Sequence, residues 1–247
     1  QPTTGVAMKK FELIQDQKIE HNGHVLFRVR ALIDFGDIKA GAIGGYVQDE
    51  SNLSQHGECW IHHDAKVYGG GYVTASANVG DEAEVYGHAK VSGMAGVWGC
   101  AHIFGNATVG EFAWVEGAAK VHGQAHVYDH ARLCSQSRVY GKAKVFGGSV
   151  LSGQAQVFDE AKVYDFAKVS DMAKIFGCAH ARDAARVRQR AQIFDHADVF
   201  GKSDISGDYE VCGDAKVDGQ SLTTESQPLP SLESFLAGKS ELPRPRA

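Results

Sequence analysis

A six-residue period runs through most of this sequence. From Ile61 to Val217 every sixth residue is Val, Ile or Leu, and Ala181 is the one smaller residue in the series. A helix has 3.6 residues per turn, so a six-residue step cannot stay on one helical face, whereas alternate residues of a strand point to the same side. The period therefore predicts short strands whose aliphatic side chains all face one interior.

The residues around each aliphatic complete the pattern. The position two before it is almost always alanine, and the exceptions are Cys59, Gly71, Ser137, Ser149, Ser203 and Tyr209. The position two after it is mostly Gly or Asp, which suit tight corners. Three strands and three corners make a triangular coil of about 18 residues, and about nine such coils would stack at about 4.8 Å. The sequence thus predicts an all-β, single-stranded parallel β-helix with a narrow interior of Ala and Val.

The repeat resembles that of the hexapeptide-repeat, left-handed parallel β-helix proteins, in which an aliphatic is followed four residues later by a small residue. Val163 with Ala167 and Val169 with Ala173 show this spacing. The segment "DFGDIKAGAIGGYV", followed by "SNLS" and "CWI", is similar to YdcK-like proteins of bacteria and phages, which are described as acyltransferases. The resemblance implies the left-handed coil, a trimeric assembly and acetyl coenzyme A as cofactor if the protein is an enzyme.

The period also divides the chain. Residues 1–7 are expected to be the remnant of a tag or a disordered start, and residues 8–58 an N-terminal β-hairpin cap with the segment leading into the coils. Asn22 and Gly23 predict the hairpin turn. Residues 59–219 form the repeat, with a two-residue slip between Leu53 and Ile61. Residues 220–247 are expected to be a linker, a short helix near 231–237 and a tail.

The outward position after each aliphatic defines three sides when every third repeat is followed. The first side carries a ladder of rings, the second begins with small residues and then carries rings, and the third is mostly small, with Trp98, Glu116 and Arg188 as its larger residues. These rings could stack within the chain, form a contact between subunits, or do both. The predicted contact residues are Tyr68, Tyr86, Phe104, Tyr140, Phe158, Trp98 and Trp114.

Four arginines gather in the segment "ARDAARVRQRAQ": Arg182, Arg186, Arg188 and Arg190. With Phe176 and Phe194 beside them on the first side, they predict a site for a nucleotide or another phosphate-bearing ligand such as coenzyme A, in a groove between subunits. A solvated charge cluster balanced by nearby aspartates is the alternative.

Acyltransferases with this fold use a histidine as general base, and the candidates here are His102, His122, His126 and His180. Each occupies a repeat position that carries Lys or Tyr elsewhere, which equally fits an ordinary surface residue. Those enzymes commonly have a loop that interrupts the coils, and the repeat from Ile61 to Val217 has none.

Composition bears on the class of partner, on membrane spans, on metal sites and disulfides, and on the compartment. A net charge of −5 argues against nucleic acid as the main partner, and no apolar run of about 18 residues predicts a membrane span. The five cysteines form no C-x-x-C pair, so neither a metal site nor a disulfide framework is predicted, and a bacterial or infected bacterial cytoplasm is expected. Three functions remain: an oligomeric binding scaffold, an acetyltransferase, and a structural assembly module.

Overall fold

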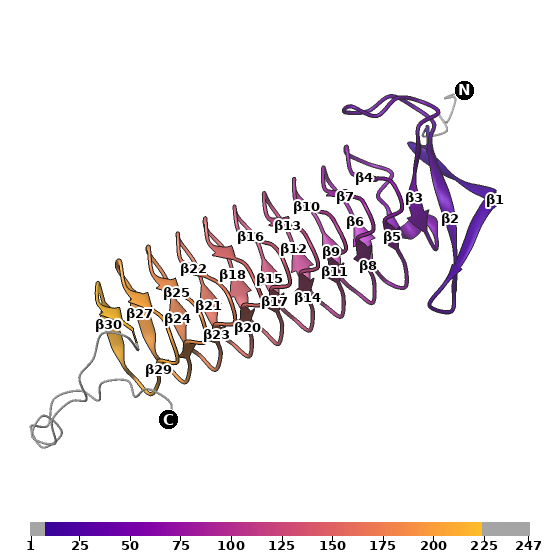
Figure 1. The fold of residues 1–247 in the computed structure, drawn as a ribbon. Coiled ribbons are helices and arrows are strands. Elements are labelled where there is room, and N and C mark those ends of the chain that lie inside the picture. The colour runs from indigo at the N-terminus through magenta and orange to yellow at the C-terminus, as the bar shows by residue number, and fades with distance from the viewer. Residues whose placement is uncertain (1–7, 224–247) are drawn as a thin grey trace, which may run out of the picture.

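The computed structural model describes residues 8–223 of the chain. It is an all-β parallel solenoid: a triangular prism of stacked coils with an antiparallel hairpin at its N-terminal end (Figure 1). The expected start at residues 1–7 and the expected helix near 231–237 lie outside the described residues. Most coil strands are two residues long, because the corner begins two residues after each inward aliphatic.

Each side of the prism is one sheet. The first side is a 12-stranded sheet that includes the hairpin. Its strands are β1 (Phe11–His21), β2 (His24–Ala31), β3 (Ile43–Val47), β5 (Lys66–Val67), β8 (Glu84–Val85), β11 (His102–Ile103), β14 (Lys120–Val121), β17 (Arg138–Val139), β20 (Gln156–Val157), β23 (Lys174–Ile175), β26 (Gln192–Ile193) and β29 (Glu210–Val211).

The second side is a 9-stranded sheet and the third a 10-stranded sheet. The second side contains β6 (Tyr72–Val73), β9 (Lys90–Val91), β12 (Thr108–Val109), β15 (His126–Val127), β18 (Lys144–Val145), β21 (Lys162–Val163), β24 (His180–Ala181), β27 (Asp198–Phe200) and β30 (Lys216–Asp218). The third side contains β4 (Trp60–Ile61), β7 (Asn78–Val79), β10 (Gly96–Val97), β13 (Trp114–Val115), β16 (Arg132–Leu133), β19 (Val150–Leu151), β22 (Lys168–Val169), β25 (Arg186–Val187), β28 (Asp204–Ile205) and β31 (Ser221–Leu222).

Strands pair in parallel with the strand one coil away, and the coil has the predicted length of three hexapeptide repeats. Val163, for example, pairs with Val145 on one side and with Ala181 on the other. Every residue therefore has the equivalent residue of the next coil directly beside it, so an outward residue type that recurs once per coil forms a continuous column.

The interior consists of the predicted Ala and aliphatic side chains. From Ile61 to Val211 the inward aliphatics are fully buried, and each buried Val stabilises the fold by about 1.5–3 kcal/mol. Serine takes the place of alanine at some inward positions: Ser203 Oγ lies 2.6 Å from Phe200 O and 3.1 Å from Val217 O and shares its one hydrogen between these acceptors, whereas the buried Ser137 Oγ has no hydrogen-bond partner among the described residues. Tyr209, which takes the place of alanine before Val211, is 1% exposed and belongs to the same core.

The corners hold the coils together through side chains as well as backbone. Asp159 has a φ of 56°, and its carboxylate accepts the backbone N–H of Gly177, one coil further on, at 3.1 Å. Asp165, Asp171, Asp183 and Asp195 accept the corner N–H of the following coil in the same way. A corner aspartate thus bonds the turn of the next coil, because the coils stack closely enough for the carboxylate to reach it.

The hairpin covers the N-terminal edge of the coils. Asn22 and Gly23 form its turn with φ values of 48° and 79°. β2 pairs with β3, whose Val47 pairs with Val67, and Leu53 pairs with Val73, so this first step is longer than a regular coil by the expected slip. A 3-10 helix, η1 (Glu50–Asn52), forms the corner between them. The edge that would otherwise be open is thereby hydrogen-bonded by the same chain.

Candidate functional site

Outward side chains make a second, diagonal contact besides the column. The residue after an inward aliphatic meets the residue before the aliphatic of the next coil. Tyr68 donates to Glu84 in this way, and Arg182 and Arg188 bond Asp198 and Asp204. The chemistry of any outward residue is therefore set by its column neighbours and by its diagonal partner.

The rings of the first side stack into one uninterrupted column. From Tyr68 to Phe194 each ring lies 4.7–5.1 Å from the next, centroid to centroid, with interplanar angles of 1–11°. His122 is one of these rings, between Phe104 and Tyr140. Tyr68 is 4% exposed because His21 and His24 of the hairpin lie against its ring, so the outward surface of the predicted contact begins at Tyr86.

A polar cluster joins the hairpin to this column. The buried carboxylate of Glu84 accepts from the Tyr68 hydroxyl at 2.8 Å and lies 2.9 Å from His21 Nε2. Asn22 donates to the same hydroxyl at 3.1 Å, and His102 Nδ1 lies 4.0 Å from the carboxylate. Burial alone would raise the pKa of Glu84, but the hydrogen bonds from Tyr68 and His21 outweigh it and hold that pKa below its ordinary value.

In the Glu84 cluster a buried carboxylate and a histidine come together as an acid–base pair, whereas His63 and Asp81, 3.2 Å apart, form an exposed one. Burial lowers the pKa of His102, which keeps its imidazole neutral, and burial raises the pKa of the Tyr68 hydroxyl, which keeps its proton. Carboxylate-oriented imidazoles act as general bases in many enzymes. His21 and Glu84 are therefore the described residues that come nearest to catalytic machinery.

The four predicted catalytic histidines do not gather at one site. His102 and His122 lie on the first side, while His126 and His180 lie on the second. His126 Nδ1 lies 2.6 Å from Thr108 Oγ1, and His180 meets the ring of Tyr164 edge-on at 6.0 Å. Burial lowers the pKa of His122 and His180 as it does that of His102. Of the four, His102 has a carboxylate within 4.0 Å, that of Glu84, and His180 has Asp198 as its neighbour on the adjacent strand β27.

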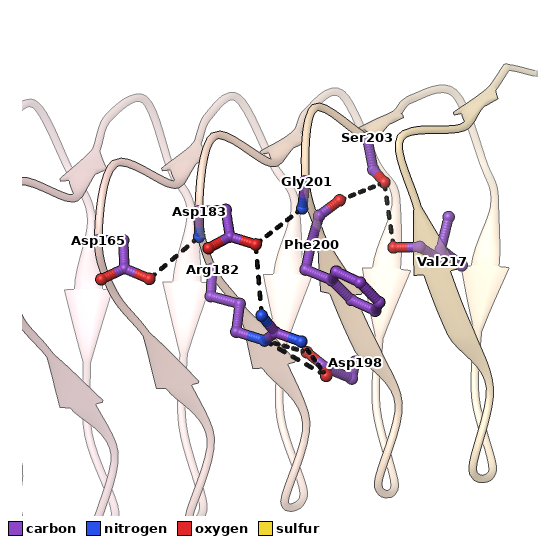
Figure 2. A network of polar contacts seen from close by, with 8 residues as sticks. All are labelled: Asp165, Arg182, Asp183, Asp198, Phe200, Gly201, Ser203 and Val217. Atoms are coloured by element: carbon purple, nitrogen blue, oxygen red, sulfur yellow. Dashed lines mark hydrogen bonds and ion pairs between the residues drawn. The ribbon is translucent and has the colours of Figure 1, made fainter.

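The predicted arginine site is occupied by carboxylates of its own chain. Arg182 bonds both carboxylate oxygens of Asp198, contacts Asp183, and lies over the ring of Phe200 (Figure 2). Arg188 forms a two-pronged ion pair with Asp204, and Arg190 forms one with Asp208. Among residues 8–223, Arg186 is the member of the group with no ion pair. A phosphate at this coil would have to compete with these aspartates.

The flanking rings of this predicted site are themselves stacked. Phe176 and Phe194 lie 5.0 Å apart on the first side, whereas Arg182 is on the second side and Arg188 on the third. The ring column and the arginines are consequently on different sides of the prism, and a single small ligand does not reach all of them.

The two tryptophans of the third side stack at 5.9 Å with an angle of 24°. Trp98 covers Gly80, and Trp114 covers Gly96, where an added Cβ would lie 2.7 Å from the indole. Trp114 Nε1 donates to Glu116 at 2.9 Å, and Arg132 bonds the other oxygen of that carboxylate. With Trp114 38% exposed, the pair is the apolar centre of the third side.

Sequence reasoning missed the hairpin residues of the Glu84 cluster and two of the arginine partners. Asp204 lies 16 residues after Arg188 and Asp208 lies 18 residues after Arg190, so the diagonal and column spacings could have found them. His21 and Asn22 had no such signal, because the hairpin is outside the repeat and its position against the coils depends on tertiary packing.

Comparison with curated proteins finds a relative in bacteria. A protein of Escherichia coli (strain K12), described as the uncharacterized acetyltransferase YdcK, is 32% identical over 80 residues. The match covers 29% of this chain and 24% of the relative, so the chain aligns with about a quarter of that protein's length. No family model matches the chain.

The repeat, the parallel solenoid and this relative agree. The chain fits the hexapeptide-repeat β-helix family. In a hexapeptide-repeat β-helix the interior is filled by the repeat, which leaves chemistry to the outward side chains and the ends. Residues 8–223 contain no helix long and apolar enough to cross a membrane, and no group of three or more metal-ligating side chains.

Proposed function

We propose that the protein is a rigid binding scaffold that works through the outward sides of its prism. The observation that carries this proposal is the unbroken stack of coils from β4 to β31: residues 60–222 contain no inserted loop that could wall a catalytic pocket. The interior residues are alike in every coil, whereas the outward ones differ from side to side, which is what a binding surface needs.

Self-association is part of this proposal. The first-side rings from Tyr86 to Phe194 form a flat, partly exposed aromatic strip, and such a strip is unusual on a monomer. We expect an oligomer, a trimer by resemblance, in which these strips and the Trp98–Trp114 pair pack against neighbouring subunits. Light scattering at micromolar concentration tests this expectation, and a monomeric mass would contradict it.

Binding of a phosphate-bearing ligand is the second part of the proposed function. The segment from Arg182 to Arg190 is a candidate position, with Arg186 as its exposed cation and Arg188 available by exchange of Asp204 for the ligand. Replacing Arg186 and Arg188 together by alanine should then weaken anion binding. Anion binding unchanged in that double variant would remove this position from consideration.

Acetyl transfer is the alternative activity, favoured by the description of the curated relative and by the His21–Glu84 pair. The arginines best placed for the phosphates of coenzyme A are already engaged by Asp198, Asp204 and Asp208. The fit to coenzyme A is therefore poor in this arrangement of the chain.

Thermal shift measurements separate the three functions. A ligand at about 100 times its Kd stabilises the folded state by about 2.7 kcal/mol. Stabilisation by nucleotides supports the binding scaffold, stabilisation by acetyl coenzyme A alone supports the enzyme, and stabilisation by neither supports a structural assembly module.

A further inference from the structure

Gly110 has no side chain, so it leaves a gap in the outward column of the second side. We call this gap, between Ser92 and Tyr128, the step. The rings that follow it along the column, Tyr128, Phe146 and Tyr164, stack at 4.9 Å. A Cβ built on Gly110 would approach Ser92 Oγ alone, at an ordinary 3.5 Å, and Gly110 is not one of the corner glycines with positive φ. A side chain would fit here, so the glycine leaves room that the backbone does not require.

Outward glycines elsewhere on the coils are covered. Trp98 lies over Gly80, Trp114 over Gly96, and Phe166 over Gly148. These three glycines make space for a ring of their own chain. Within the described part of the chain no ring fills the step at Gly110 in the same way.

Tyr128 turns one ring face toward this step. Its other face is stacked on Phe146 at 4.9 Å and 3°. A planar ring over Gly110 would continue the column against Tyr128, with Ser92 of the preceding coil on its far side. Parallel strands are about 4.8 Å apart, so the step between Ser92 and Tyr128 spans two strand spacings and has the thickness of one aromatic ring.

The diagonal partner of Gly110, on the next coil, is His126. Elsewhere this diagonal brings a histidine edge-on to a ring, as His180 meets Tyr164 at 6.0 Å and 76°. His126 is held by Thr108 Oγ1, 2.6 Å from Nδ1, so its ring is fixed before a ligand arrives. Its Nε2, which has no hydrogen-bond partner among residues 8–223, is suited to a nitrogen or oxygen on the edge of a heteroaromatic ring.

Charge distinguishes the two flanks of the step. Exposed Lys90 and Lys144 lie on the strands on either side of Thr108 and His126. The other flank is the corner with Glu111 and Asp129, which are acidic. An anionic group on a bound ring would therefore be drawn toward the lysines and away from the corner.

We propose that the step over Gly110 binds the base of a nucleotide, which stacks on Tyr128 with its edge at His126 and its phosphate toward Lys90 and Lys144. This site deepens the proposed binding function, on which it rests, and it lies apart from the arginine segment. Stacking on an aromatic side chain tolerates different bases, so the site selects a nucleotide class and not one base.

Filling the step tests the proposal directly. Gly110→Phe should complete the column, raise the Tm and abolish binding of adenosine monophosphate, measured by ligand-observed NMR and calorimetry. Gly110→Ala is the matched control, because it adds a Cβ without a ring and should leave binding within about threefold. Tyr128→Ala should weaken binding by about tenfold, which corresponds to about 1.4 kcal/mol.

A comparison of adenosine monophosphate with adenosine tests the proposed phosphate contact. Replacing Lys90 and Lys144 by alanine should weaken adenosine monophosphate binding about tenfold and leave adenosine binding unchanged; equal effects on both ligands would overturn the phosphate placement. Binding of adenosine monophosphate that survives Gly110→Phe would overturn the site while leaving the binding function standing. The absence of nucleotide binding to the unmodified protein at millimolar concentration would overturn the site. The proposed scaffold function would then be tested separately, by the oligomer mass from light scattering.

Discussion

Arg182 lies over the ring of Phe200, with 4.1 Å from its guanidinium carbon to the ring centroid. The two residues occupy the same outward position in successive coils, so the guanidinium takes the place of a ring in the second-side column. Asp198, on the diagonal, holds both of its edge nitrogens (Figure 2). Arginine thus continues an aromatic column because it is planar and can be held flat by one carboxylate.

Replacement of Arg182 should show this role. We expect Arg182→Ala to lower the free energy of unfolding by about 1–2 kcal/mol, because it removes a two-pronged ion pair and a ring contact from a half-exposed site. Arg182→Lys should recover less than half of the loss, since an ammonium group cannot lie flat between Asp198 and Phe200. Urea denaturation measures both, and an alanine variant as stable as the parent would contradict the role.

Corner aspartates should be replaceable by asparagine and not by alanine. Asp159 has a φ of 56° and accepts the N–H of Gly177. Asp159→Ala keeps a Cβ at positive φ and loses the acceptor, so we expect a cost of about 1–2 kcal/mol. Asp159→Asn retains an acceptor and tolerates this φ, and its expected cost is under about 0.5 kcal/mol. Equal costs for the two variants, measured by thermal unfolding, would rule out the inter-coil hydrogen bond as the reason for aspartate here.

His122 should make stability depend on pH between neutrality and weak acid. Burial in the ring column lowers its pKa from the ordinary 6.5, so the unfolded chain binds a proton more readily than the folded one. Stability should therefore fall as pH drops below about 6.5, until the folded-state pKa is passed. His122→Phe keeps the stacked ring without the titration, so it should raise the Tm in weak acid more than in weak base. His196→Phe, at a corner outside the column, is the control.

Glu84 should control how the stability of the packed hairpin changes at lower pH. Its hydrogen bonds hold its folded-state pKa below the ordinary 4.5, so its stabilising contribution is complete above 4.5 and is lost as pH falls through the lower folded value. Glu84→Gln should flatten the dependence of the Tm on pH below about 4.5. The protection factors of the β1 and β2 amides against hydrogen exchange are expected to fall in the same pH range, in the unmodified protein only. An unchanged pH profile in the glutamine variant would show that other carboxylates control the transition.

Much of the fold was predictable because the repeat encodes it position by position. Val163 and Ala161 face inward since strand geometry puts alternate residues on one side, and the length of a coil follows from three strands and three corners. The same coil length correctly placed Tyr140, Phe158 and Phe176 in one column. Prediction failed where partners come from outside the repeat or from the diagonal. Asp204 beside Arg188 is 16 residues away and was overlooked, although the spacing was there to be read.

The amino-acid sequence by itself determined the inside of the prism, its length in coils and the composition of each side, because a six-residue period allows one arrangement of Ala, Val and corner. The tertiary structure decided which outward side chains are paired or covered by other residues and which remain accessible. It folded His21 onto Glu84 and covered Tyr68, it paired Arg182 with Asp198, and it left Gly110 beside the bare face of Tyr128. The physical reason is that inward contacts repeat with the chain, whereas outward contacts depend on which particular side chains stacking brings within reach.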